Sequence, residues 1–183
     1  MKPMNRSGLL RTAALLLAAL FFTMSLASCK QRGEFAPPAG YQAASDEKAD
    51  FHFYVPDKWT VDYSTGAAGA YFSAADPSSV SVMAWELPHA DTALDEWWEL
   101  NRAEIEKVFD DFTLESEENT TVDGQYAKKF VYTASLGGYR YRYQQVAAIK
   151  GTSVYLFTYA STEENYETHL DQVNEMLGYL LLR

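Results

Sequence analysis

Two glycine-containing turns divide residues 129–159 into three strand-like runs, and their register constrains the fold more than any other feature of the sequence. Taking Gly137-Gly138 as a two-residue hairpin turn pairs four residues with four others: Leu136 with Tyr139, Ala134 with Tyr141, Tyr132 with Tyr143, and Phe130 with Gln145. One face of this hairpin is then aromatic. A three-residue loop would exchange the two faces of a strand, because side chains alternate along it.

The next turn, at Gly151-Thr152, brings apolar side chains to the opposite face as well. It places Tyr155, Phe157 and Tyr159 beside Ala148, Val146 and Gln144. Since both faces then carry apolar side chains, both need cover from a second layer.

Two amphipathic segments provide that cover. In the first, from about 92 to 109, one helical stripe holds Leu94, Trp98, Asn101, Ile105 and Val108, and Asp91 or Thr92 is a candidate N-cap. In the second, from about 163 to 181, the stripe is Tyr166, Leu170, Val173, Leu177 and Leu180, and Ser161 and Glu164 have capping-box spacing. The sequence therefore predicts an α+β fold, with a helix on each side of a central antiparallel sheet. Shorter strands are expected at 51–56, 59–64, 71–74, 80–87 and 112–118.

The N-terminus has the layout of a secretory signal peptide. Lys2, Arg6 and Arg11 precede the apolar run 12–24, which is followed by small residues. The run is shorter than the roughly 20 residues that a membrane span requires. We expect residues 1–28 to be a cleaved signal, and a retained short anchor helix is the alternative.

Leu26-Ala27-Ser28-Cys29 resembles the lipobox of bacterial lipoproteins, and Cys29 is the one cysteine of the chain. The resemblance implies cleavage between Ser28 and Cys29, a diacylglyceryl group on the thiol and usually an acylated (palmitate-type) amino terminus. The protein is then expected to be lipid-anchored to a cell membrane and to face away from the cytoplasm. A free reactive thiol and an intermolecular disulfide are the alternatives.

Residues 29–50 are rich in Ala, Gly, Pro and charge, which predicts a flexible tether, and 51–183 is the expected globular domain. Removing three of the 15 basic residues with the signal leaves 12 against 25 acidic residues, a formal charge of −13. Such a surface repels nucleic acid and anionic headgroups, so attachment must come from lipid.

Two short motifs resemble PsbP-like and DcrB-like domains. Phe51-x-Phe53-x-x-Pro56-x-x-Trp59 is similar to the opening of these domains, and "TVDGQYAKKFVYT" (residues 121–133) is similar to their Gly-x-x-Ala-Lys strand. With an aromatic strand and a closing helix, the resemblance covers 51–183. It implies an α/β/α sandwich, and known members are extrinsic assembly factors on photosynthetic membranes or exported lipoproteins. Nothing in the sequence supports a photosynthetic role.

No catalytic residues, metal ligands or cofactor-binding motif are identified. His52, His89 and His169 are scattered and lack metal-ligand spacing. A basic cluster stands out instead: Arg140 and Arg142 share a strand face with Lys129 on the paired strand. It is a candidate site for a small anionic ligand or an acidic envelope protein. The alternative is that these cations neutralise nearby carboxylates.

These observations favour a non-enzymatic, membrane-anchored extracytoplasmic lipoprotein, a binding or accessory module of the cell envelope. An exposed apolar or basic patch would support that interpretation. A small envelope hydrolase or metal-dependent enzyme is the alternative, and a deep pocket uniting His89 or His169 with carboxylates would favour it.

Overall fold

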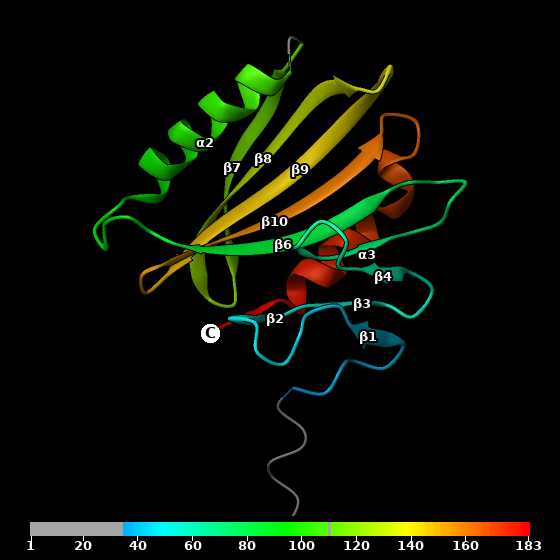
Figure 1. The fold of residues 1–183 in the computed structure, drawn as a ribbon, viewed down its shortest axis with the longest axis horizontal. Helices are drawn as coiled ribbons and strands as arrows, with labels where there is room; N and C mark the ends of the chain where they lie inside the picture. The colour runs from blue at the N-terminus through cyan, green and yellow to red at the C-terminus, as the bar shows by residue number, and fades with distance from the viewer. Residues whose placement is uncertain (1–34, 110) are drawn as a thin grey trace, which may run out of the picture. The chain divides into compact units, whose positions relative to one another are not determined.

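A computed structural model describes residues 35–109 and 111–183, and the folded unit extends from Pro37 to Arg183. Its centre is a seven-stranded antiparallel sheet in the order β4-β5-β6-β10-β9-β8-β7 (Figure 1). The strands are β4 (Thr60–Asp62), β5 (Ala68–Tyr71), β6 (Ser79–Glu86), β7 (Thr113–Val122), β8 (Gln125–Leu136), β9 (Tyr139–Lys150) and β10 (Ser153–Thr162). Within the described ranges, no helix has both the length and the apolar character that a membrane span requires.

The register expected for the three long strands is confirmed. Tyr132 pairs with Tyr143 across the Gly137-Gly138 turn, and Phe157 pairs with Val146 across the next one. Both glycines of the first turn have positive φ, 60° and 85°, a conformation that L side chains rarely adopt. The short turn therefore fixes which side chains share each face.

Helix α2 (Leu94–Val108) covers the aromatic face. Trp98, which is 1% exposed, stacks on Phe130 of β8 with ring centroids 3.4 Å apart. Beside them Tyr132 stacks on Tyr143 at 4.9 Å. The large aromatic rings thus form the contact between this helix and the sheet.

The expected start of α2 is wrong by one or two residues. Ala93 is the N-cap and makes no side-chain cap bond, whereas Thr92 Oγ1 donates to the carbonyl of His89. The prediction that Val108 belongs to the buried stripe is also wrong. Its side chain is 72% exposed, because the last turn of the helix extends beyond the part that packs on the sheet.

Helix α3 (Tyr166–Gly178) covers the opposite face, together with two small sheets. These pair β1 (Tyr41–Ala43) with β3 (Tyr54–Pro56), and β2 (Phe51–His52) with β11 (Leu181–Leu182). The core of this layer is a single cluster that includes Phe53, Val55, Trp59, Val146, Phe157, Tyr159, Val173 and Met176. The α+β sandwich, with a helix on each side of the sheet, is therefore confirmed.

Both ends of α3 differ from the expectation. Ser161 lies in β10, buried against Ser78, so the proposed capping box does not form, and Asn165 is the N-cap without a side-chain bond. The chain leaves the helix after Gly178, because the last apolar residues pair with β2 as strand β11.

The folded unit begins earlier than residue 51, where the sequence analysis placed it. Residues 37–50 belong to the compact unit, and Tyr41–Ala43 of this segment form β1 against β3. Tyr41 also donates a 2.6 Å hydrogen bond to Glu175 of α3. The composition of this segment is tether-like, but its few aromatic and backbone contacts fix it to the domain. The part of the expected tether before residue 35, the expected signal and Cys29 lie outside the described residues.

Trp59 is a buried residue that contacts several parts of the α3 layer. Its side chain is 1% exposed, and its ring contacts Phe72 and His169 edge-on, with centroids 5.7 and 5.5 Å away. Its indole Nε1–H donates to Gln172 of α3 at 3.3 Å.

Replacement of Trp59 by alanine is expected to lower the free energy of unfolding by about 3–5 kcal/mol, because it leaves a large cavity in a closed core. Tyr139→Ala, at a side chain that is 66% exposed, is the matched control and is expected to stay within about 0.5 kcal/mol of wild type. Urea unfolding followed by circular dichroism measures both. Similar losses in the two variants would contradict the packing described here.

Candidate functional site

The predicted basic cluster is assembled by the β8–β9 hairpin. Thr133 of β8 lies opposite Arg142 of β9, and strand alternation puts Arg140, Arg142 and Lys129 on the face that α3 covers. The guanidinium of Arg140 also donates from Nη2 to Thr133 Oγ1 at 2.6 Å. The common face inferred from sequence is therefore confirmed.

Carboxylates surround Arg140. Its Nη1 lies 2.9 Å from Asp111 and its Nε 3.2 Å from Glu163. Asp111 in turn accepts hydrogen bonds from the hydroxyl and backbone N–H of Ser135, and these bonds hold the pKa of Asp111 below its usual value. Arg140 thus joins the end of the hairpin to the segment before β7 and to the loop before α3.

Arg142 is held in the same way. Its Nε lies 2.8 Å from Glu115 of β7 and its Nη1 3.0 Å from Glu167 of α3. Its guanidinium also covers the ring of Tyr166 at 4.6 Å, and burial raises the pKa of that tyrosine to about 12. Lys129, the third member, pairs with Glu118 at 2.9 Å.

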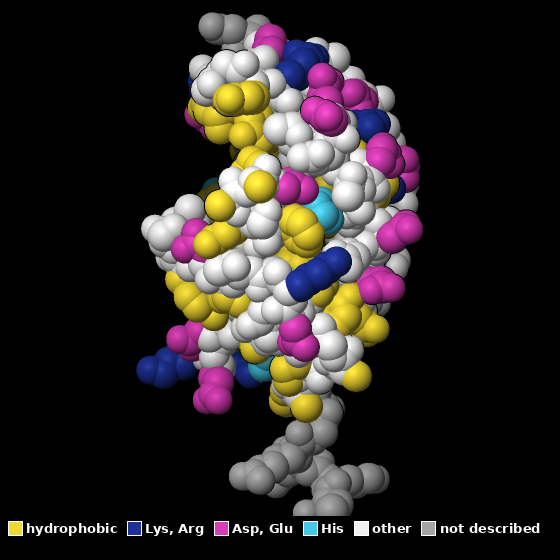
Figure 2. All heavy atoms as spheres, turned by 90° about the vertical axis from the view of Figure 1, so that its right-hand side faces the viewer, with side chains coloured by type: hydrophobic (Ala, Val, Ile, Leu, Met, Phe, Trp, Pro, Cys, Tyr) yellow, Lys and Arg dark blue, Asp and Glu magenta, His cyan; other side chains and the backbone are white. Residues whose placement is uncertain are grey.

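Each cation of the cluster therefore has at least one carboxylate partner. Figure 2 shows the same pattern, with basic and acidic side chains side by side over the upper part of the face it views. This geometry favours the alternative interpretation, in which the cations neutralise nearby carboxylates of the same domain. Anion or partner binding by Arg140, Arg142 and Lys129 stays a hypothesis.

One structural cation was not identified as a candidate from the sequence, although it is the lysine of the Gly-x-x-Ala-Lys motif. Lys128, on the face that α2 covers, lies between Asp95 of α2 and Glu117 of β7, and its side chain is 13% exposed. The hydrogen bonds that its ammonium group donates to these carboxylates raise its pKa. Sequence reasoning missed it because the helix and the strand that supply its partners are distant in the chain.

The three histidines lie in different places, and one of them, His169, is buried beside a carboxylate. His169 Nε2 lies 2.8 Å from Asp76 Oδ2, and the other oxygen of Asp76 accepts from Ser78, whose hydroxyl contacts Ser161 at 2.7 Å. Burial raises the pKa of Asp76, but the hydrogen bonds from Ser78 and His169 outweigh it and the net pKa is lowered. His52 is buried, and burial lowers its pKa, whereas His89 is exposed.

This network does not form a reaction centre that a substrate reaches. His169 is 4% exposed, and both serines are fully buried. Across residues 35–109 and 111–183, no group of three or more His, Cys, Asp or Glu side chains is arranged to hold a metal ion. The network instead ties α3 to β10 and to the connection between β5 and β6.

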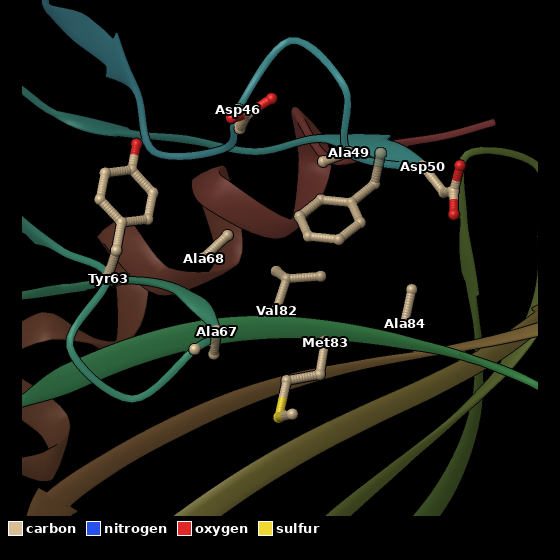
Figure 3. Close-up of a pocket in the computed structure, with 11 residues that line it drawn as sticks. Asp46, Ala49, Asp50, Tyr63, Ala67, Ala68, Val82, Met83 and Ala84 are labelled. Atoms are coloured by element: carbon tan, nitrogen blue, oxygen red, sulfur yellow. The ribbon is translucent and has the colours of Figure 1, made fainter.

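The described residues line several surface cavities, of which two adjoin the basic cluster. One of about 530 Å³ is lined by Arg140 with Tyr139 and Asn165, and one of about 240 Å³ by Lys129 with Asn174. The third, of about 370 Å³, lies between β6 and the segment before β2 (Figure 3). None of these three is lined by a histidine.

Exposed apolar side chains gather beside the third cavity. Met83 and Trp85 of β6 are 38% and 40% exposed, and the ring of Trp85 lies 6.5 Å from that of Trp97 on α2. The sequence analysis predicted a strand at 80–87 but did not identify its exposed side chains as a candidate surface. A partly open apolar strip of this kind is typical of an interaction surface.

Comparison with known proteins identifies the fold. No family model and no curated protein matches the sequence. Among solved structures, the chain is similar to the cyanobacterial PsbP protein CyanoP of Synechocystis, with a TM-score of 0.56 and 18% identity over 87% of this chain and 99% of that one. It is equally similar to PA94 of Pseudomonas aeruginosa, called a putative regulator, with a TM-score of 0.56 and 18% identity over 78% and 97% of the two chains.

A third similar structure is LpqN of Mycobacterium tuberculosis, described as involved in cell envelope biogenesis. The TM-score is 0.55 and the identity 16%, over 72% of this chain and 82% of that one. At these identities the comparisons show the fold, which is PsbP-like.

Arg142→Gln is expected to lower the free energy of unfolding by about 1–2 kcal/mol, because two carboxylates and a tyrosine ring lose their cation. Lys129→Gln, which breaks one exposed pair, is expected to cost about 0.5 kcal/mol or less. Urea unfolding compares them. Unchanged stability of Arg142→Gln, together with inorganic phosphate binding that the wild type shows and the variant loses, would favour the anion-binding hypothesis instead.

Proposed function

We propose that the protein is a lipid-anchored accessory protein of the cell envelope, which binds another envelope protein on the extracytoplasmic side of the membrane. The observation that carries this proposal is the pair of exposed apolar side chains Met83 and Trp85 on β6, which lie beside the half-buried Trp97 and an open cavity. A non-enzymatic binding role explains why such side chains remain at the surface of an otherwise acidic chain.

The fold gives further support. LpqN, with a similar fold, is described as involved in cell envelope biogenesis, and CyanoP is a PsbP protein. Leu26-Ala27-Ser28-Cys29 supplies the proposed anchor, since acyl chains contribute about 0.8 kcal/mol of membrane binding per buried methylene.

The position of Cys29 in the sequence supports a partner that lies near the membrane. Eight residues, 29–36, separate the cysteine's position from the start of the folded unit at Pro37. Even a fully extended segment of this length spans at most about 29 Å. The domain is therefore suited to a partner at the bilayer surface.

Cys29→Ser is expected to abolish incorporation of an alkyne fatty-acid analogue and to move the protein from the membrane pellet to the soluble fraction of lysed cells. Wild type is expected to be labelled and membrane-bound. Ser28→Ala keeps a small residue before the cysteine and serves as the control, with labelling close to wild type. Equal labelling of wild type and Cys29→Ser would reject the lipid anchor.

A further inference from the structure

Strand β6 is paired along its whole length on one side only. Its inner edge pairs with β10 from Ser79 to Glu86, whereas its outer edge pairs with β5 only from Ser79 to Val82. The ladder stops there because the chain before β5 turns away at Gly66, which has a φ of 79° and donates its N–H to the carbonyl of Tyr63 at 3.0 Å. The outer edge from Met83 to Glu86 is left open.

Hydrogen bonds at the ends of β6 show which backbone groups face this open edge. Leu87 donates its N–H to Thr152 on the β10 side, whereas Ser78 accepts from Phe72 on the β5 side. Because backbone groups alternate sides along a strand, the N–H and C=O groups of Ala84 and Glu86 point to the outer edge. Among the residues that the structure describes, none provides them with a hydrogen-bond partner.

The far edge of the sheet is protected in a way that β6 is not. Strand β7 carries Glu115, Glu117 and Glu118 and is irregular between Leu114 and Ser116, which are features that block strand addition. The open part of β6 has instead the apolar residues Met83 and Trp85. It is a regular strand edge that another strand can extend.

The two faces of this edge offer different contacts. Figure 3 shows the side chains of Val82 and Ala84 directed into the 370 Å³ cavity and that of Met83 directed away from it. The remaining walls include Ala49, Phe51 and Ala68. A strand paired with β6 would therefore direct alternate side chains into an apolar cavity and over Met83 and Trp85.

Two carboxylates line the cavity. Figure 3 places Asp50 at its Ala84 end and Asp46 toward its other end. Both side chains are exposed. Asp46 accepts a hydrogen bond from the backbone N–H of Lys48, and the guanidinium of Arg183 donates to the backbone carbonyls of Glu47 and Ala49. Glu86 adds a third carboxylate at the same end of β6 as Asp50. A basic side chain opposite Glu86 would complement this charge.

We propose that the outer edge of β6 from Met83 to Glu86 binds an extended segment of a partner protein as an added antiparallel strand. The segment carries Lys or Arg opposite Glu86 and an aliphatic residue two positions later, opposite Ala84. Backbone hydrogen bonds to Ala84 and Glu86 supply affinity, and the cavity and Asp50 supply specificity. This inference rests on the proposed function and identifies the chemistry of its partner.

A second copy of this chain fits the edge less well. Antiparallel pairing of two β6 edges would bring Glu86 and Asp50 of both copies to one interface, in a chain whose formal net charge is −10. Like charges at a strand pair are destabilising. The charge pattern favours a basic peptide.

The test uses full-length protein in detergent and a fluorescent capped pentapeptide, Thr-Lys-Thr-Val-Thr, with binding followed by anisotropy. N-methylation of the Lys and Val amides, which would face β6, is expected to weaken binding about tenfold or more, because it removes two donors. N-methylation of the central Thr amide, which would face away, is the matched control and is expected to change binding about twofold at most. Replacing Lys by Glu is expected to weaken binding about tenfold or more.

On the protein side, Asp50→Asn is expected to weaken binding about threefold or more and to reduce its salt dependence, whereas the exposed Asp57→Asn is the control with unchanged binding. Absence of binding by the parent peptide, or equal effects of the inward and outward N-methyl groups, would overturn the proposal. A dimer in sedimentation whose β6 amides are protected would assign the edge to a second copy instead. Fatty-acid labelling of Cys29 is measured separately, so the anchor and the strand-addition site succeed or fail independently.

Discussion

The structure depends on apolar burial against both faces of the β8–β10 unit. Because side chains alternate along β9, Tyr143 and Ala147 face α2, and Val146 and Ala148 face α3. Both faces therefore carry apolar side chains that must be buried. Full burial of an apolar side chain as large as Val146 contributes about 1.5–3 kcal/mol, so both faces require a covering layer. The helices, the small sheets of the N-terminal segment and the C-terminal strand β11 all follow from that requirement.

The sequence was sufficient for this central unit because two short turns specify it. Gly137-Gly138 and Gly151-Thr152 fix the register, and the register fixes both faces. Local sequence patterns were less informative at the helix ends. Ser161 and Glu164 have the spacing of a capping box, but Ser161 belongs to β10 and its hydroxyl contacts that of Ser78. Strand β1 was missed because three residues in an Ala- and Pro-rich segment carry no alternation that distinguishes them from a tether.

The candidate sites also combine features that the sequence predicts with features that it does not. Strand alternation correctly placed Arg140 and Arg142 on one face, but their carboxylate partners come from β7, α3 and the loops, which no local pattern connects to β9. The open edge of β6 was beyond sequence reasoning for another reason. It exists because β5 is shorter than β6, and strand length is set by the turn at Gly66 rather than by the composition of β6. The open edge therefore results from the difference in length between β5 and β6.

The central claim is that both faces of the sheet are covered, while the outer edge of β6 is open along part of its length. Amide hydrogen exchange within β6 is the most direct test of this claim. The amides of Met83 and Trp85 face β10 and are expected to exchange slowly, whereas those of Ala84 and Glu86 face the open edge and are expected to exchange much faster. An alternating slow-fast-slow-fast pattern from 83 to 86, beside uniformly slow exchange in β9, is the predicted result. Equal protection at all four positions would contradict the open edge.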